Sequence, residues 1–268
     1  MTTASEIRWA RTATTYEAGS VPVTVYERDR TQPFLLLHGG AGPASVAAFG
    51  DLLAARKHAR VIMPTHPGFD GTPRPENLSS VRDLAQLYAN LLGELDVAGV
   101  TVIGNSIGGW LAAELALLGS PRISGAILID AVGAEVPGHQ VTDIRGLRPD
   151  QLMALSFHDP ARFAPDPGGP GPSPEMVQAN MATLFTYAGP AMTDLTLLDR
   201  LRHLDLPVHV IWGEADGIVT PDYGRAIAKA IPGAHFTLMP EAGHLPQVEA
   251  PEELLGVIRD RSRMTPVP

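Results

Sequence analysis

Residues 100–109 read Val-Thr-Val-Ile-Gly-Asn-Ser-Ile-Gly-Gly and indicate a sharp turn between a strand and a helix. The first four form a β-branched run, which is typical of a strand. The next five have the form Gly-x-Ser-x-Gly, the pattern of a nucleophile elbow with a serine at its tip. Glycines two residues before and after Ser106 leave room for the strand and the helix to approach each other. Residues 110–118 then have a helical pattern that stops at a Gly-Ser-Pro stretch, which supports this interpretation.

Strand-like and helix-like segments alternate through most of the chain. Strands are expected at 12–16, 21–26, 33–37, 59–63, 100–103, 125–129, 208–212 and 235–239. Helices are expected at 46–56, at 80–95 after a capping box of Ser80 and Asp83, at 110–118, and from Pro221 and Pro251. This alternation predicts an α/β fold, a mostly parallel sheet of about eight strands with helices on both faces.

Residues 134–195 interrupt the alternation. They contain two helical stretches that carry proline, 149–157 and 174–188, and a Gly- and Pro-rich stretch at 164–174. We therefore expect residues 1–133 and 196–268 to form the core, and residues 134–195 to form a small helical cap or lid with a mobile loop near 166–172. A surface extension without a role in substrate binding is the alternative.

The composition argues against several classes of function. The chain of 268 residues has a formal net charge of −9 and scattered cations, which argues against nucleic acid as a partner. It has no cysteine, which excludes disulfides, thiolate metal sites and a cysteine nucleophile. The N-terminus lacks the apolar core of a signal peptide, and no segment approaches the ~18 uninterrupted apolar residues of a membrane span.

These observations lead to expectations about location and partners. We expect a soluble, cytoplasmic protein that acts on a small molecule and has no membrane partner. A homodimer is compatible with the sequence, which does not determine the oligomeric state.

A serine at an elbow needs a base, which is usually a histidine oriented by a carboxylate. In this fold logic the acid and then the histidine follow the serine, each on a loop after a strand. Asp216 follows the expected strand at 208–212, and His244 follows the one at 235–239. Ser106, Asp216 and His244 are therefore predicted to form a catalytic triad.

Rival residues exist for both partners of the serine. Glu214 lies in the same loop as Asp216, and Asp130 stands directly after the expected strand 125–129, where related architectures can place the acid. Seven of the eight other histidines are expected to be solvated, structural or part of the entrance loop. These are His58, His139, His158 and His203 (solvated), His209 and His235 (structural), and His38 (entrance loop).

A hydrolytic intermediate also needs N–H donors for its oxyanion. The backbone N–H of Ile107, at the start of the helix after Ser106, is one expected donor. The second is expected from residues 38–42, His-Gly-Gly-Ala-Gly, with Gly40 preferred and Ala41 as the alternative. The same stretch lacks the third glycine of a dinucleotide fingerprint, and no phosphate-binding P-loop pattern exists. No His, Asp and Glu cluster has metal-ligand spacing, so the sequence predicts neither a cofactor nor a metal.

Together these motifs resemble the α/β-hydrolase fold superfamily over nearly the whole chain. The resemblance rests on stretches that occur in the family's order, namely 37–40, 66–69, 104–108, 213–216 and 243–244. It implies an α/β-hydrolase fold with Ser106 as nucleophile, His244 as base and Asp216 as orienting acid. A serine at the elbow argues against the dehalogenase and epoxide-hydrolase branches, which use an aspartate there.

The resemblance implies hydrolysis of a small or medium-sized, mainly apolar carboxylic ester through an acyl-serine. Residues 39–45 and Asn105 also resemble the carbon–carbon bond hydrolases that cleave ring-fission products. Leu245 departs from that pattern, because those enzymes usually have a tryptophan after the histidine. Their substrates are carboxylated, and the candidate arginines are Arg145, Arg148 and Arg162. Lactonase, perhydrolase and thioesterase activities, and a non-catalytic ligand receptor on the same fold, stay open.

The expected cap carries many apolar side chains, of which a part would form a pocket for an apolar acyl or alcohol group. The candidates are Met153, Leu155, Phe157, Phe163, Met176, Met181, Leu184, Phe185 and Tyr187. Trp110 is expected to pack at the elbow helix rather than to stack on a ligand.

Overall fold

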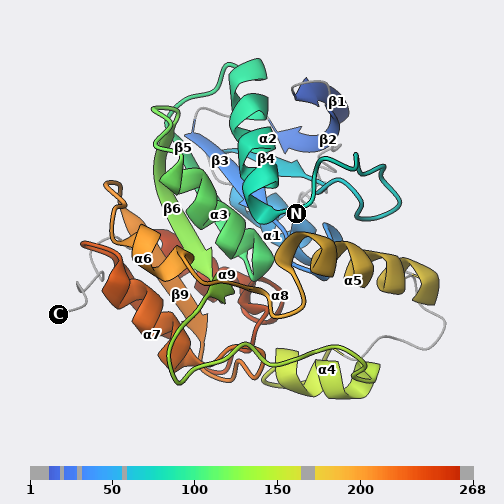
Figure 1. Cartoon of the computed structure of the whole chain (residues 1–268), viewed down its shortest axis with the longest axis vertical. Helices are drawn as coiled ribbons and strands as arrows, with labels where there is room; N and C mark the ends of the chain where they lie inside the picture. Colours follow the sequence, from blue (N-terminus) through green and yellow to red (C-terminus); the bar gives the residue numbers. More distant parts are fainter. Residues whose placement is uncertain (1–11, 19–20, 29–31, 56–58, 164–172, 260–268) are drawn as a thin grey trace, which may run out of the picture.

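The computed structural model describes residues 12–18, 21–28, 32–55, 59–163 and 173–259 (Figure 1). Within this part, eight strands form one sheet in the order β1-β2-β4-β3-β5-β6-β9-β10. They are β1 (Thr12–Ala18), β2 (Val21–Arg28), β3 (Gln32–Leu37), β4 (Ala59–Pro64), β5 (Val100–Asn105), β6 (Ile123–Ile129), β9 (Val208–Gly213) and β10 (His235–Met239). The expected α/β fold is confirmed.

The direction of the strands explains where a site can form. Strand β2 is antiparallel to both of its neighbours, whereas every pairing from β4 across to β10 is parallel. The carboxyl ends of these six parallel strands therefore lie at one edge of the sheet. The loops after β3, β5, β6, β9 and β10 begin at this edge, and they carry the residues that the sequence singles out.

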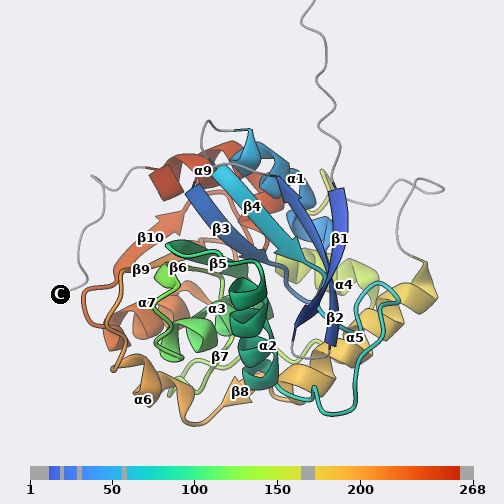
Figure 2. The same cartoon turned by 90° about the horizontal axis from the view of Figure 1, so that it is seen from above.

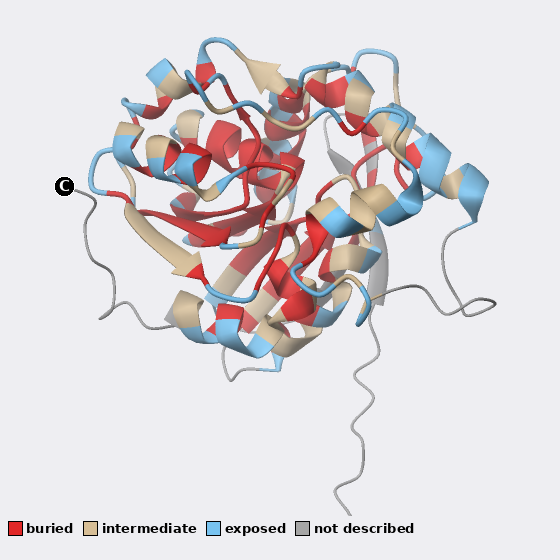
Figure 3. Ribbon diagram, turned by 90° about the horizontal axis from the view of Figure 1, so that it is seen from below, coloured by how far each residue is buried: buried red, intermediate tan, exposed pale blue. Residues whose placement is uncertain are grey.

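Side chains of the central strands alternate between two hydrophobic clusters, as the two-residue period of a strand requires. Leu35 and Leu37 pack on one face with α2 (Val81–Glu94), α3 (Ile107–Leu117), α6 (Leu197–Leu201) and α7 (Pro221–Ala230). Phe34 and Leu36 pack on the other face with α1 (Ala44–Ala54) and α9 (Pro251–Arg259). Figure 2 shows the helices on both sides of the sheet, and Figure 3 shows that the central strands are buried.

Helix boundaries follow the signals in the sequence closely. Ser80 accepts a hydrogen bond from the N–H of Asp83, whose side chain in turn accepts one from the N–H of Ser80. This capping box starts α2 at Val81, as expected. Helices α7 and α9 begin at Pro221 and Pro251, which is also as expected. Helix α1 covers 44–54 and is shifted by two residues from the expected 46–56.

Residues 134–195 contain α4 (Pro149–Ser156) and α5 (Pro174–Ala188), which lie at one side of the molecule (Figure 1). At the base of the segment, β7 (Gly133–Ala134) pairs with β8 (Thr193–Asp194) in a separate two-stranded sheet. The described part of the segment adds no strand to the main sheet. The expected mobile loop at 166–172 lies outside the described residues.

Helix α5 is attached to the loop after β4 by three side chains on one face. Asn180 accepts a hydrogen bond from the N–H of Asp70 at 2.9 Å and donates one to its carboxylate at 3.1 Å. Thr183 donates to the carbonyl of Gly68, and Tyr187 donates to the carbonyl of Pro67. Positions 180, 183 and 187 share a helix face, so these contacts hold the C-terminal half of α5.

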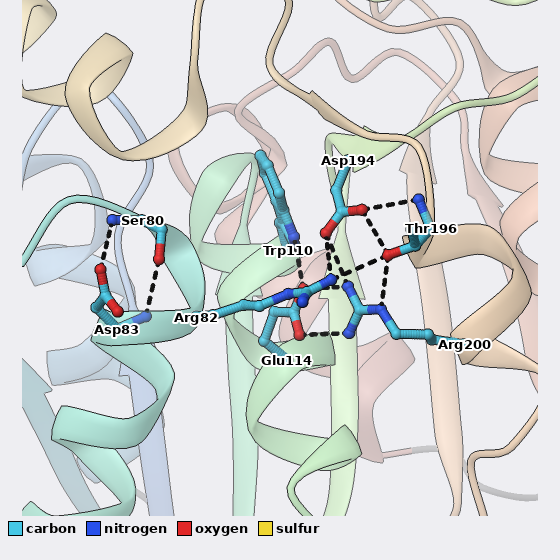
Figure 4. A network of polar contacts seen from close by, with 8 residues as sticks. All are labelled: Ser80, Arg82, Asp83, Trp110, Glu114, Asp194, Thr196 and Arg200. Carbon is cyan, nitrogen blue, oxygen red and sulfur yellow. Dashed lines mark hydrogen bonds and ion pairs between the residues drawn. The ribbon is translucent and has the colours of Figure 1, made fainter.

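A polar network joins the helix after the elbow to the end of segment 134–195 (Figure 4). Glu114 of α3 has a side chain only 5% exposed and accepts two hydrogen bonds from Arg200 of α6, at 2.7 and 2.6 Å. Trp110 donates to the same carboxylate at 3.1 Å, so it packs at the elbow helix as expected. Arg200 and Arg82 both bind Asp194 of β8. The buried carboxylate of Glu114 also lies 3.7 Å from Arg82 of α2, so its contacts with Arg82 and Arg200 tie α3 to α2 and α6.

None of the helices in the described ranges has the length and apolar composition needed to cross a membrane.

Candidate active site

Ser106 stands between the end of β5 and the start of α3 with a left-handed backbone (φ 58°, ψ −121°). Its N–H donates to the carbonyl of Ile129 at 2.9 Å, which holds the turn against β6. A Cβ at Gly104 would overlap the carbonyl of Gly108, and a Cβ at Gly108 would overlap the carbonyl of Leu37. The two glycines of the motif are therefore required by the close approach of strand, helix and neighbouring loop.

His244 and Asp216 meet at the same edge, as expected. His244 Nδ1 lies 2.8 Å from Asp216 Oδ2, and both residues are buried. The other oxygen of Asp216 accepts hydrogen bonds from the N–H groups of Ile218 and Val219 at 2.8 and 3.0 Å. These bonds fix the carboxylate, which in turn places the proton of a neutral histidine on Nδ1, so Nε2 is the ring nitrogen that carries the lone pair.

The loop that carries His244 is held by backbone and side-chain contacts. The N–H of His244 donates to the carbonyl of Ser156 at 2.8 Å. Glu249 of α8 (Pro246–Glu249) accepts hydrogen bonds from the N–H groups of Gly243 and His158. This buried carboxylate therefore links the histidine loop to the end of α4, a contact that sequence patterns did not indicate.

Asn105 connects the elbow to the histidine loop. Its amide nitrogen donates to the carbonyl of His244 at 2.9 Å and to that of Ile129 at 3.3 Å, and its oxygen accepts a hydrogen bond from Gln247 at 3.1 Å. In the sequence, the asparagine before the serine is part of the pattern that resembles carbon–carbon bond hydrolases. The structure shows that its amide is engaged within the protein.

The loop after β3 faces the serine. Gly40 and Ala41 line the same cavity as Ser106, and a Cβ at Gly39 would lie 3.1 Å from the Cβ of Ser106. Ile107 is the first residue of α3, so its N–H has no acceptor within the helix. Of the two predicted positions, Gly40 thus lines the cavity that Ser106 lines, and Ile107 directly follows the serine.

Two buried histidines shape this loop. The N–H of His66 donates to His38 Nε2 at 3.1 Å, so His38 carries its proton on Nδ1, 2.8 Å from the carbonyl of Gly39. His66 Nε2 lies 3.0 Å from the carbonyl of His38, and its Nδ1 lies 2.7 Å from the hydroxyl of Tyr88. Burial lowers the pKa of His38 to about 4 and that of His66 well below its ordinary value. Both rings are therefore neutral supports of the glycine loop.

A cavity of about 270 Å³ opens between Ser106, His244 and the helices of segment 134–195. Its lining residues are Gly40, Ala41, Asn105, Ser106, Ile144, Leu152, Ser156, Val177, Asn180, Met181, Leu184, Met192, Ile218, His244 and Leu245. Most of them are apolar, and within the described part of the chain none is Lys or Arg. Of the expected cap residues, Met181 and Leu184 line the cavity, while Phe157 stacks on Phe163 and Tyr187 binds Pro67.

The rival acids differ in position. Glu214 is exposed at the sheet edge. Asp130 is fully buried and, with Asp216 and His244, belongs to a group whose carboxylate and imidazole atoms lie within 4.8 Å of one another. The sequence spacing did not reveal this cluster, because its members come from three separate loops. Since His244 Nδ1 and Asp216 Oδ2 already bind each other at 2.8 Å, their geometry is that of a hydrogen bond rather than of two ligands around a cation.

Among the described residues, no histidine other than His244 lines the cavity. His158 and His203 are exposed and His139 is partly so, whereas His58 lies outside the described residues. His209 of β9 lies 2.8 Å from the hydroxyl of Thr237 and packs edge to face with His235 of β10. Burial and the neighbouring His235 lower the pKa of His209 to about 4.

The chain has sequence relatives in Pseudomonas putida. The chain is 28% identical over 243 residues to the dihydrolipoyllysine-residue acetyltransferase component of the acetoin cleaving system of Pseudomonas putida, a match that covers 83% of this chain and 61% of that protein. It is 25% identical over 271 residues to 2-hydroxymuconate semialdehyde hydrolase of Pseudomonas putida, with 91% of each protein covered. The chain therefore spans less than two thirds of the first relative and nearly all of the second.

Solved structures are similar over the whole fold. The 2-hydroxy-6-oxo-6-phenylhexa-2,4-dienoate hydrolase of Rhodococcus sp. strain RHA1 superposes with a TM-score of 0.75 at 20% identity, covering 95% of this chain and 99% of that chain. At this identity the likeness shows the fold. Residues 34–257 match the alpha/beta hydrolase family. Because this match extends over most of the chain, the protein belongs to the α/β hydrolase family.

Proposed function

We propose that this protein is a serine hydrolase that cleaves a small or medium-sized, mainly apolar carboxylic ester. Ser106 is the nucleophile, His244 the general base and Asp216 the acid that orients it. The N–H groups of Ile107 and Gly40 are the donors to the oxyanion. The hydrogen bond between His244 Nδ1 and Asp216 Oδ2, beside a cavity that Ser106 also lines, carries this proposal.

The reaction proceeds in two halves. Ser106 Oγ attacks the ester carbonyl while His244 Nε2 takes the hydroxyl proton, and the oxyanion accepts hydrogen bonds from the two backbone N–H groups. The bond to the alcohol then breaks, and His244 gives its proton to the leaving oxygen. A water molecule, deprotonated by His244, attacks the acyl-serine; the carboxylic acid leaves and Ser106 regains its proton.

Residues 134–195 act in this proposal as a cap over the site, with residues 1–133 and 196–268 as the core. Leu152 and Ser156 of α4 and Val177, Met181 and Leu184 of α5 contribute to the cavity that contains Ser106. An apolar wall of this kind favours an apolar acyl or alcohol group, and methionine adapts to groups of different shape. Tolerance among neutral esters of medium length follows.

Carbon–carbon bond hydrolysis is the second candidate, because one relative with 91% coverage carries the name of such an enzyme. A carboxylated substrate needs a cation in the pocket, and the candidate arginines lie elsewhere. Arg145 and Arg148 pair with Asp143 and Asp150 on the surface, and Arg162 is exposed and packs on Phe163. The apolar lining therefore favours the ester over the carboxylated dienoate.

A substrate panel tests the proposal. Turnover is measured for p-nitrophenyl esters of increasing acyl length, for a lactone and for a ring-fission dienoate, with Ser106→Ala as the matched control. Ester cleavage that requires Ser106 supports the proposal. Cleavage of the dienoate alone assigns the protein to the carbon–carbon hydrolases, and failure of Ser106 to react with an organophosphonate supports the receptor alternative.

A further inference from the structure

Asp130 is a buried acid for which the mechanism above has no use. It directly follows β6 with a left-handed backbone (φ 46°) and has no exposed surface. Its Oδ1 accepts a hydrogen bond from the N–H of Gly213 at 2.8 Å. Its Oδ2 is buried and has no hydrogen-bond partner among the described residues. A buried charged oxygen without a donor is costly, so this atom requires an explanation.

The surroundings of Asp130 are acidic. The side chain lies beside Asp216 and His244: a carboxylate oxygen of each acid and a ring nitrogen of the histidine lie within 4.8 Å of one another. Glu249 is a further negative charge nearby. Burial, and then the charge of Asp216, raise the pKa of Asp130 well above its ordinary value, with Glu249 acting in the same direction and the N–H of Gly213 against it. Two adjacent buried carboxyl groups share a single proton more readily than they both ionise.

The hydrogen bonds indicate which of the two acids holds the proton. Asp216 faces three N–H groups, those of Ile218, Val219 and His244, which all require an acceptor. Within the described part of the chain, Asp130 accepts from one N–H, that of Gly213. A proton on Asp130 Oδ2 would give this atom a hydrogen bond to make, and Asp216 is the acceptor beside it.

We propose that Asp130 is a protonated positioning residue, whose carboxyl group donates a hydrogen bond to the Asp216 carboxylate. Asp216 then has donors on both sides, and its orientation toward His244 no longer depends on its two backbone bonds alone. The same hydrogen bond draws negative charge away from His244 and so limits how strongly the imidazolium is stabilised. The catalytic meaning of this role rests on the proposed function, whereas the protonation of Asp130 does not.

The experiment is an NMR titration of the His244 imidazole in the full-length protein, from about pH 4 to pH 9. In Asp130→Asn, the amide oxygen can accept from Gly213 and the amide nitrogen can donate to Asp216, so the side chain mimics a neutral, protonated acid. We expect the midpoint of the His244 titration to move by less than half a pH unit. Asp216→Asn is the positive control, because it removes a charge beside the ring and must lower the midpoint.

An ionised Asp130 predicts the opposite result. Loss of its charge in Asp130→Asn would then lower the His244 midpoint by about one unit or more, a tenfold loss of proton affinity, and this would overturn the proposal. In Asp130→Leu the side chain cannot donate a hydrogen bond to Asp216. The midpoint of the His244 titration is therefore expected to rise, and kcat is expected to fall further than in Asp130→Asn. Equal behaviour of the two variants would also contradict the hydrogen bond to Asp216. If Asp130→Leu does not fold, the comparison of Asp130→Asn with Asp216→Asn still decides.

A separate readout keeps this inference distinct from the proposed function. Infrared difference spectra of wild type against Asp130→Asn at neutral pH are expected to show the carbonyl band of a protonated carboxyl group in the wild type. Absence of this band would overturn the proposal even if esters are hydrolysed. Presence of the band with no hydrolysis of any ester would instead leave the protonation of Asp130 established and reject the proposed function.

Discussion

The side-chain amide of Asn105 donates a hydrogen bond of 2.9 Å to the backbone carbonyl of His244, a residue 139 positions later in the chain. Asn105 immediately precedes Ser106, so this bond sets the position of the histidine loop relative to the elbow. Gln247 supports it by donating to the oxygen of the same amide. The position of His244 relative to Ser106 therefore depends on Asn105, which is not a member of the predicted triad.

Asn105→Ala should lower kcat about 10- to 100-fold with a smaller effect on KM, because it misplaces His244 and changes only one of the many residues that line the cavity. The buried carbonyl of His244 also loses its donor, which should cost about 1–3 kcal/mol of unfolding free energy. Steady-state kinetics on the best ester and urea unfolding measure both effects. A rise in KM at constant kcat would instead indicate that Asn105 contacts the substrate.

Ser106→Ala should reduce turnover to the level left by binding and the oxyanion hole. Alanine and serine are similar in size and adopt the same backbone at the elbow, so the unfolding free energy should change by less than about 1 kcal/mol. Activity and thermal unfolding of the same preparation provide the measurement. Ester turnover comparable to that of the wild type would exclude Ser106 as the nucleophile.

The stability of the fold should decrease as the pH falls from about 6.5 to about 4. Folded His38 has a pKa lowered to about 4 by burial, while the unfolded chain binds the proton near 6.5, so protons favour unfolding in this window. The contribution of His38 is about 3 kcal/mol, fully present above pH 6.5. His66 and His209 act in the same direction.

Asp130 opposes this trend, because its raised pKa keeps a proton in the folded state that the unfolded chain releases above about 3.8. Asp130→Asn should therefore show a steeper fall in stability over the same window. Urea unfolding at several pH values, for wild type and variant, measures both slopes. A free energy of unfolding that rises toward pH 4 in the wild type would contradict the neutral, buried state of the histidines.

Arg200→Met should destabilise the protein by about 3 kcal/mol, since it leaves the buried Glu114 carboxylate without its two-bond partner. Removing one partner of a buried ion pair typically costs roughly 3–5 kcal/mol. The loss is expected at the low end of this range because Trp110 and Arg82 still contact Glu114. In Glu114→Gln the charge is absent, and adding Arg200→Met should then cost clearly less. A double-mutant cycle of unfolding free energies gives the coupling, and strict additivity of the two changes would rule out the interaction.

Met181→Ala should shift the preference toward longer acyl chains, because Met181 is a flexible part of the cavity wall on α5. The ratio of kcat/KM between a long and a short p-nitrophenyl ester should rise several-fold, which is less than the roughly 10- to 200-fold that one methylene group in a hydrophobic pocket can contribute. Met153→Ala is the matched control, since Met153 lies on α4 and outside the lining. An unchanged ratio in Met181→Ala would mean that the acyl group binds elsewhere.

Local sequence could predict the parts of this fold that depend on short-range geometry. The glycines around Ser106, the capping box at Ser80 and the prolines that start α7 and α9 all act within a few residues of themselves. Strand and helix order followed from periodicity, and order in turn indicated that Asp216 and His244 would reach the same edge of the sheet as Ser106. The lining of the cavity could not be predicted in this way, because a helical pattern does not say which face meets the site.

The sequence by itself determined the α/β architecture, the elbow and the identity of its serine, because steric limits on the backbone and the alternation of apolar residues are local properties. Only the tertiary structure decided the rest. It placed Asp216 rather than Glu214 against His244, brought Asp130 beside them, and engaged Asn105 with the histidine loop. Each of these relations joins loops from different strands, so their distances are set by the packing of the sheet and not by spacing along the chain.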